Sequence, residues 1–445
     1  MGVATRVNSA SDRVIAAAER LRPTQHDFNN AQPGTAAWAI LRLFTRPSMA
    51  AAPRYPRFYG GDHVKGEVLL SPTRPRRSIA SITVLLRGTI KTGVGSGGTY
   101  CFLEYTHQVW DPTVGPSQPG NTGLTFSFPF PECLDYGSPS GRPRPHSRTL
   151  HRTPQTTFAV DAQYRIEYEI ILKITHSDVH LNEVSDIKSK VFFIPAVTPG
   201  PPSIMRQEAY SRNLPLPGPH VDPQGWVTLP ALSVVGFFRQ QRVKLDYALH
   251  LASPLSYTRG TCIPCYLSVS GEDAQPLDSL TTPEMLYMRL VRYTRFFEDP
   301  AKGTEQYLNN QQPRVLEKVE EVGRATWWFP SGVQQERRFR RLEGEIYLEE
   351  NLSPTSNFLP LAVKYKVEFL PFNHLNSRTF RQSEVGDDQQ RPNIMLSHSV
   401  TIATVAADGP PQRTSSHPRQ SSPQDSSSNQ GGTDRVRDWV RSQGN

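Results

Sequence analysis

The sequence predicts an all-β protein built from two antiparallel β-sandwiches in tandem, and three observations support this fold class. Proline is unusually frequent, with 40 prolines in 445 residues, and proline interrupts helices. Many short segments alternate apolar and polar residues, which is typical of half-buried strands. One pattern that opens a strand also occurs in each half of the chain, which indicates two equivalent domains.

Residues 1–35 are mostly small and polar, and we expect them to form an N-terminal extension. Within them, the segment SDRVIAAAERLRP predicts one short helix with Ser11 as its N-cap and Pro23 at its end. The apolar face of this helix, formed by Val14, Ala18 and Leu21, is thin. A helix that docks loosely on the first domain, or that becomes ordered on binding, is therefore favoured over a membrane anchor.

Residues 36–197 are predicted to form the first sandwich. The clearest signal is YRIEYEIILKI, residues 164–174, where apolar and charged side chains alternate without interruption. Further strands are predicted at 36–45, 58–70, 78–88, 123–131 and 190–195. The Pro-, Ser- and Arg-rich segment 135–155 is expected to be a long surface loop. The glycines of KTGVGSGG lack a following helix and a Lys-Ser or Lys-Thr end, so they do not predict a phosphate-binding loop.

The second half of the chain repeats this organisation. Residues 198–225 are rich in proline and glycine and are expected to connect the two domains. Residues 226–405 are predicted to form the second sandwich, and residues 406–445 to form a disordered tail, because they lack apolar content. The strands of this half are expected in VKLDYALHL, LYMRLVRY, LEGEIYL, VKYKVEF and SHSVTIATV.

The repeated pattern is found in FYGGDHVKGEVLL and SYTRGTCIPCYLSV. Phe58 and Gly61 in the first segment correspond to Tyr257 and Gly260 in the second, with the same spacing. The glycine would permit a sharp turn, and the polar residue after it could bond the backbone of that turn. A single weak repeat could also arise by chance. The expected inward positions are Val64, Gly66 and Val68 in the first half, and Ile263, Cys265 and Leu267 in the second.

Charge and cysteine content limit the function classes. The net charge of +8, from 49 basic and 41 acidic residues, fits a solvated surface or weak attraction to acidic partners. No basic run is interleaved with stacking aromatics, so nucleic acid is not an expected partner. Cys262 and Cys265 form a lone CxxC without a second pair, which favours two reduced thiols over a zinc or redox site.

Neither a signal peptide nor a run of about 18 apolar residues is recognised, so a soluble cytoplasmic protein is expected. The sequence also contains no nucleophile-elbow pattern and no pair of acids in a context that would separate their pKa values. We therefore expect a protein that is not an enzyme, with no catalytic residue, metal or cofactor.

Taken in order, these segments resemble the arrestin superfamily, specifically the α-arrestin-like trafficking adaptors of fungi. The segment 58–70 is similar to the family's aromatic-x-Gly-Asp-x-Val-x-Gly entry, and SITVLLRGTIKT, FSFPFPECL and YRIEYEIILKI are similar to the strands after it. In the second half, LASPLSYTRGTCIPCYLSV, LEGEIYLEENLSPTSNF and LAVKYKVEF resemble the second arrestin domain. The resemblance covers residues 36–405 and depends on order and spacing, not on one decisive motif.

The resemblance implies the arrestin fold, two tandem immunoglobulin-like antiparallel β-sandwiches. It also implies an adaptor that binds the cytosolic tails of membrane transporters or receptors and links them to endocytic trafficking or ubiquitination. Further implied partners are a ubiquitin ligase and an anionic surface of the plasma membrane or endosomes. The chain departs from the family in lacking Pro-Pro-x-Tyr, which puts direct ligase recruitment in doubt. Pro195 stands near the position of the arginine on which the phosphate-triggered switch of receptor-binding arrestins depends.

The candidate binding residues are basic or aromatic. Guanidinium groups could capture an acidic or phosphorylated peptide or anionic lipid, and the alternative is that these charges solubilise loops and protect strand edges. Trp327 and Trp328 could form an aromatic contact surface, although we expect one ring to pack inside the second sandwich. The basic candidates are Arg42, Arg46, Arg74, Arg76, Arg77, Arg337, Arg338, Arg340 and Arg341.

Two other functions remain open. A β-sandwich module that binds a small ligand, such as a lectin-like or lipid-binding domain, would reveal itself by a deep closed cavity. An enzyme on a sandwich scaffold would require a buried Ser-His-Asp cluster. The adaptor hypothesis instead predicts a peptide-sized surface.

Overall fold

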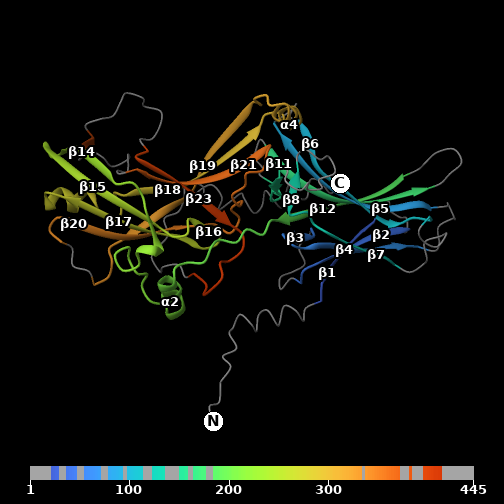
Figure 1. Ribbon diagram of the computed structural model, residues 1–445, viewed down its shortest axis with the longest axis horizontal. Coiled ribbons are helices and arrows are strands. Elements are labelled where there is room, and N and C mark those ends of the chain that lie inside the picture. Colours follow the sequence, from blue (N-terminus) through green and yellow to red (C-terminus); the bar gives the residue numbers. More distant parts are fainter. Residues whose placement is uncertain are drawn as a thin grey trace, which may run out of the picture. The chain divides into compact units, whose positions relative to one another are not determined.

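The computed structural model describes residues 22–29, 37–47, 55–71, 79–93, 98–113, 123–135, 150–158, 164–176, 184–332, 336–370, 380–382 and 394–412. Strands dominate the described residues, so the predicted all-β class is confirmed (Figure 1). The chain divides into two compact units. Unit 1 comprises Met1–Pro195 with Glu298–Arg314, and unit 2 comprises Ala196–Phe297 with Val315–Asn445.

The first sheet of unit 1 has four antiparallel strands in the order β1-β2-β4-β7. Strand β2 buries every second residue, as a sheet with one core-facing side requires. The strand nearest the start of the described chain, β1, lies in the predicted N-terminal extension, while most of the predicted helix lies outside the described residues. The bounds are β1 Thr24–Asn29, β2 Ala39–Thr45, β4 His63–Leu70 and β7 Leu124–Pro129.

The second sheet of unit 1 follows the order β3-β12-β11-β5-β6, with β10 also paired to β11. Aromatic rings contact each other between the two sheets: the ring centroids of Tyr105 on β6 and Phe128 on β7 lie 5.1 Å apart. A short hairpin, β8–β9, occupies both ends of the predicted 135–155 loop, whose middle lies outside the described residues. The bounds are β3 Arg57–Tyr59, β5 Ile79–Thr92, β6 Thr99–Trp110, β8 Cys133–Asp135, β9 Leu150–Arg152, β10 Thr157–Phe158, β11 Tyr164–His176 and β12 Val184–Ile194.

Unit 2 contains one long sheet, in the order β16-β23-β21-β18-β19-β20-β17-β15-β14-β22, with β13 on β15. The sheet folds over at β19, which pairs with β18 up to Arg324 and with β20 from Ala325 onward. A register shift lies just before this change of partner, and such bulges bend a strand from one layer into another. Tyr247 of β15 and Phe369 of β21 then contact each other between the two layers, with tilted rings whose centroids lie 5.8 Å apart.

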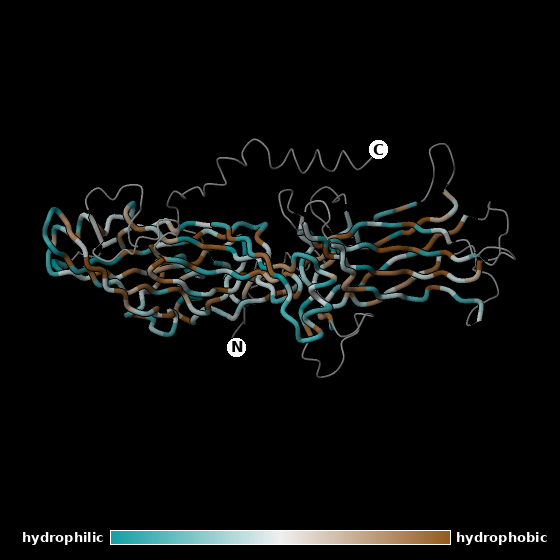
Figure 2. Tube along the Cα trace, turned by 90° about the horizontal axis from the view of Figure 1, so that it is seen from above, coloured by the Kyte–Doolittle hydropathy of each residue, from teal (hydrophilic) through white to brown (hydrophobic). Residues whose placement is uncertain are grey.

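The strands of unit 2 carry alternating apolar residues along their length, as Figure 2 shows for both units by the brown segments of the tube. Their bounds are β13 Trp226–Thr228, β14 Leu232–Phe238, β15 Gln241–Ala252, β16 Ser256–Thr258, β17 Cys262–Gly271, β18 Tyr287–Phe297, β19 Val315–Trp328, β20 Phe339–Tyr347, β21 Leu361–Leu370, β22 Phe380–Gln382 and β23 Leu396–Ala403.

Short helices interrupt this pattern in two informative places. The segment 198–225, expected to connect the two domains, contains α2, Ile204–Arg212, and the 3₁₀ turn Pro223–Gly225. The connector therefore packs on unit 2, where it buries Arg206 and Tyr210. The second place is the loop between β18 and β19, which carries α4, Pro300–Leu308, and belongs to unit 1, where Thr92 Oγ1 donates to the carbonyl of Glu298 at 2.8 Å. The other helix within the described residues is α3, Ala274–Leu280.

The repeated strand-entry pattern has the same geometry in both units. Gly61 and Gly260 have φ angles of +85° and +81°, the left-handed region that glycine adopts without strain. Each entry strand pairs in parallel with a late strand of its own unit, β3 with β12 and β16 with β23. Asp62 Oδ2 accepts from the N–H of Tyr59 at 2.8 Å, so the polar residue bonds the turn's backbone as predicted.

A second shared element, which we call the Thr–Tyr clamp, fixes the loop that precedes β11 in unit 1 and the loop that precedes β21 in unit 2. In unit 1, Thr156 exchanges two hydrogen bonds with the backbone of Phe193, and the Tyr168 hydroxyl donates to the carbonyl of Pro154 at 2.8 Å. In unit 2, Thr355 bonds the backbone of Ile402 in the same way, and the Tyr365 hydroxyl donates to the carbonyl of Ser353 at 2.6 Å.

Candidate functional site

Two basic candidates of unit 1, Arg42 on β2 and Arg46 just after this strand, are already bound to carboxylates. Arg42 bonds both oxygens of Asp27, at 2.9 and 3.0 Å, and lies 3.6 Å from Glu67. These bonds lower the pKa of Asp27. Arg46 pairs with Asp62 and lies over the ring of Tyr59. An incoming phosphate would have to displace these partners. The candidates Arg74, Arg76 and Arg77 lie outside the described residues.

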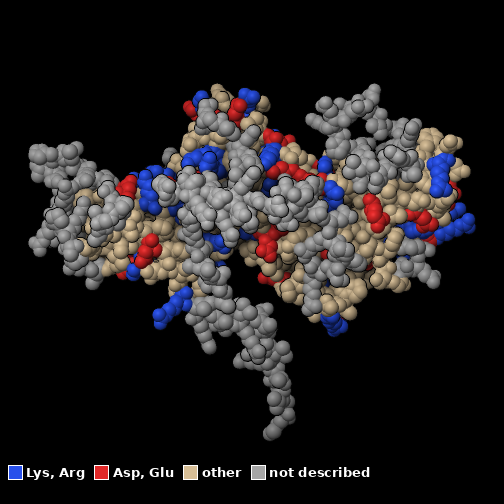
Figure 3. All heavy atoms as spheres, turned by 180° about the vertical axis from the view of Figure 1, so that it is seen from behind, with Lys and Arg blue, Asp and Glu red and all other residues tan. Residues whose placement is uncertain are grey.

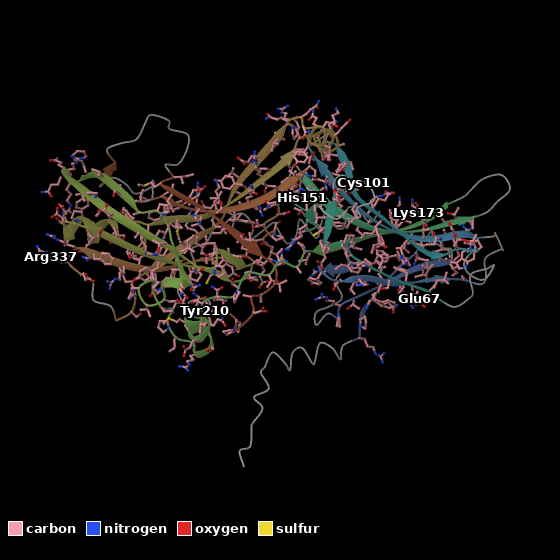
Figure 4. The ribbon with its side chains drawn as sticks, viewed as in Figure 1. Glu67, Cys101, His151, Lys173, Tyr210 and Arg337 are labelled. Carbon is pink, nitrogen blue, oxygen red and sulfur yellow. The ribbon has the colours of Figure 1, made fainter. Side chains whose placement is uncertain are left out.

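The basic cluster of unit 2 is divided by the strand geometry. Arg340 is 7% exposed and bonds Asp278 of α3 at 2.7 Å, which makes it a packing residue. Arg337 and Arg338 are exposed in the turn before β20, and no ion pair within the described residues engages them. Figure 4 shows Arg337 at the end of the sheet, well separated from Tyr210 of α2. On the face shown in Figure 3, basic and acidic side chains are interspersed.

The two tryptophans point to opposite sides of β19. Trp327 is 4% exposed, and its ring covers Gly344, where an added Cβ would come within 2.5 Å of it. Trp328 is half-buried, and its Nε1 donates to Glu343 Oε2 at 3.1 Å. One ring therefore packs inside the unit and the other is partly exposed.

Trp328 lies on the same sheet face as Arg341, and together they define the candidate site. Strand register places Trp328, Glu343, Tyr266 and His250 in one row across four strands. Arg341 lies in the neighbouring row of β20, with its guanidinium 5.0 Å from the ring centre of Phe339. We call this surface the outer face of unit 2. Its members are His250, Tyr266, Trp328, Phe339, Arg341 and Glu343.

The outer face presents aromatic rings and hydrogen-bonding groups, and it carries little net charge. Burial lowers the pKa of His250, so its ring is neutral at pH 7. Burial also raises the pKa of Tyr266, which keeps its proton. His250 Nδ1 lies 2.9 Å from Thr228 Oγ1 of β13. Such a surface suits an extended peptide with apolar side chains and an occasional acidic group.

Metal or thiol chemistry has little support in the part of the chain that the structure describes. No group of His, Cys, Asp or Glu side chains there is arranged to hold a metal ion. Cys262 and Cys265 are free thiols in the core, and burial raises the pKa of both. The lone CxxC consequently places two poorly reactive thiols on opposite sides of β17.

Sequence reasoning missed two polar networks. In one, Glu368 of β21 is 1% exposed and accepts from Arg289 at 2.9 Å and from the hydroxyl of Tyr293. The signal was present, because Arg289 and Tyr293 share one face of LYMRLVRY, and the alternation in VKYKVEF places Glu368 on the polar face of its strand. The other network surrounds Arg206 in the connector, where no periodic pattern indicated burial.

Comparison with known proteins adds no identification: neither the family models nor the curated proteins searched match this chain. Among the described residues, no helix combines the length and apolar character needed to cross a bilayer.

Proposed function

We propose that the protein is a non-enzymatic, arrestin-like adaptor with two immunoglobulin-like β-sandwiches. It would bind cytosolic segments of membrane transporters or receptors and link them to endocytic trafficking or ubiquitination. The observation that carries the proposal is the repeated design of the units. Each has a positive-φ glycine turn, a parallel entry strand and a Thr–Tyr clamp. This repetition supports the family resemblance of the sequence.

The outer face of unit 2 is the proposed cargo surface. An extended cytosolic segment would lie across β17, β20 and β19, with apolar side chains against Trp328 and Phe339 and an acidic group near Arg341. The exposed Arg337 and Arg338 lie just before β20 and would raise the local concentration of acidic segments or bring the unit to an anionic membrane surface.

Proximity labelling with the full chain in its native cell tests the adaptor function. The expected result is enrichment of membrane transporters or receptors together with ubiquitin or endocytic machinery. Trp328→Ala should reduce this enrichment, because the ring leaves the proposed surface. Tyr307→Ala is the matched control, since Tyr307 is 40% exposed on α4 of unit 1. Labelling without membrane proteins would refute the adaptor, and equal loss in both variants would refute the assignment to the outer face.

A further inference from the structure

A small pocket lies where the connector, the strands of unit 2 and the segment after β23 meet. Its cavity volume is about 50 Å³, so it has room for a group of a few heavy atoms. Four prolines and two tyrosines contribute to its wall. The lining residues are Pro199, Gly200, Pro202, Arg206, Tyr210, Ala252, Ser253, Pro254, Ser256, Tyr257, Thr258, Pro264, Ala407 and Gln412.

The pocket is lined by a buried positive charge that has no ion-pair partner among the described residues. Arg206 is 3% exposed, and its Nη1 donates to the carbonyl of Ser253 at 2.8 Å while its Nη2 donates to that of Gly225. Its guanidinium also lies 5.1 Å from the ring centre of Trp226. The nearby carboxylate of Asp222 is occupied by the hydroxyl of Ser203 and the N–H of Gly225.

This arrangement is costly for the empty protein. An arginine keeps its proton, and a buried charge without an opposite charge is unfavourable. Neutral carbonyls and a ring satisfy some of the N–H groups of Arg206, and the Asp222 carboxylate offsets its desolvation only in part, because the two make no ion pair. An anion in the adjacent pocket would supply the missing charge in a low-dielectric site, where the attraction is strongest.

The pocket also contains a hydroxyl donor. Tyr210 is 6% exposed, and its hydroxyl makes no hydrogen bond with any residue that the structure describes. Burial raises its pKa, so the hydroxyl keeps its proton. The neighbouring Tyr257 is different, because its hydroxyl already donates to the carbonyl of Ala252.

We propose that this pocket binds a compact oxyanion, the size of inorganic phosphate or a small carboxylate, between Arg206 and Tyr210. A bound anion would join α2 to the wall made by Ser253 and Gln412, and so would fasten the connector to unit 2. The site is separate from the proposed cargo surface, because none of its lining residues belongs to the outer face.

Titration of the full chain with sodium phosphate and with sodium acetate, followed by calorimetry and thermal unfolding, tests the proposal. Sodium chloride at equal ionic strength is the reference. The expected result is saturable binding and a rise in unfolding temperature with at least one of the two anions, and the two arms distinguish phosphate from carboxylate. No saturable effect beyond chloride from either anion would overturn the proposal.

Two helix variants separate binding from packing. Tyr210→Phe keeps the ring and removes the donor, so it should weaken the anion affinity about ten-fold, the equivalent of one hydrogen bond to a charged group. Arg212→Met, on the same helix, should leave affinity unchanged, because Arg212 is exposed and pairs with Glu208. Unchanged affinity in Tyr210→Phe would overturn the assigned geometry.

Discussion

Strand β4 of unit 1 and strand β17 of unit 2 follow the same turn but differ on their second face. Both bury the inward residues, Val64, Gly66 and Val68 in one and Ile263, Cys265 and Leu267 in the other. On the opposite face, Lys65 of β4 is exposed, whereas Pro264 and Tyr266 of β17 are buried.

The connector and β13, the strand directly after it, account for this difference. Trp226 contacts Tyr266, with ring centroids 6.0 Å apart, and Tyr210 and Pro264 line the same pocket. In unit 2, the strand with the repeated pattern therefore has an added cover, formed by residues such as Tyr210 and Trp226, over its second face. The cover encloses the pocket at one end of the sheet and buries Tyr266, while Trp328, Phe339 and Arg341 of the outer face stay partly exposed beside it.

The largest expected effect comes from exchanging the inward residues of the two strands. At Gly66, an added Cβ would lie 2.5 Å from the carbonyl oxygen of Arg42 and 2.4 Å from the ring of Phe126. Gly66→Cys should therefore destabilise unit 1 by about 3 kcal/mol, at the upper end of overpacking effects. Chemical denaturation of the full chain measures the change.

The reverse exchange, Cys265→Gly, calibrates this result. It removes a small buried side chain and adds backbone entropy to the unfolded state, so it should cost about 1–2 kcal/mol. If Gly66→Cys were the milder of the two, the close approach of Phe126 would not be what makes the units differ at this position.

Next in size are the two Thr–Tyr clamps, which we predict to be energetically alike. Tyr168→Phe and Tyr365→Phe each remove one hydroxyl, and each takes the tyrosine donor from a backbone carbonyl. The expected loss is about 1–2 kcal/mol for each variant, measured as the unfolding free energy of the full chain. A negligible loss of unfolding free energy for one of the two variants alone would show that the clamps share their geometry but do not stabilise the two units equally. Tyr307→Phe, on an exposed side chain, is the control.

The sequence predicted strands best where a regular period reflects one buried face. The segment 164–174 matches β11 for this reason. Strand β6 was not predicted, because two register shifts opposite β5, near Phe102 and Val109, break its alternation. Strand β1 was missed because His26 alone is buried in it.

The candidate site was less predictable, because side-chain direction depends on register with distant strands. Trp328 and Arg341 belong to separate motifs, and only the pairing of β19 with β20 and β17 places them on one face. The same register turned Arg340 toward Asp278. The packing of the connector on unit 2 was not predicted, because Arg206 is buried by tertiary contacts and these leave no local periodicity in the sequence.

A smaller effect concerns acid sensitivity in unit 1. His26 of β1 is 8% exposed and lies 3.2 Å from Thr45 Oγ1. Burial lowers its pKa more than Asp27 raises it. Because the folded pKa is below the unfolded value of about 6.5, its contribution is complete above that pH and is lost as the pH falls through the folded pKa.

The measurement is unfolding free energy between pH 7.5 and 5. Wild type should lose more stability over this range than His26→Gln, which cannot take up the proton. The comparison should be made in high salt as well, since the exposed Asp27–Arg42 pair is screened there. An identical loss in both proteins would mean that His26 is not the group that titrates.

The smallest perturbation uses the native thiols, which report on the two units separately. Cys101 and Cys133 belong to unit 1, and Cys101 is exposed, while Cys262 and Cys265 are buried in unit 2. With a maleimide at neutral pH, Cys101 should react in the folded protein, although burial and Glu104 raise its pKa and slow the reaction. Cys262 and Cys265 should react only when unit 2 opens, because the thiolate must form in the core. In the folded protein, the amide of Gln412 in the segment after β23 donates to the Cys262 carbonyl at 2.8 Å. Labelling Cys262 at the rate of Cys101 under native conditions would show that this segment does not stay closed over β17. In that case the added cover would not distinguish the two units in solution.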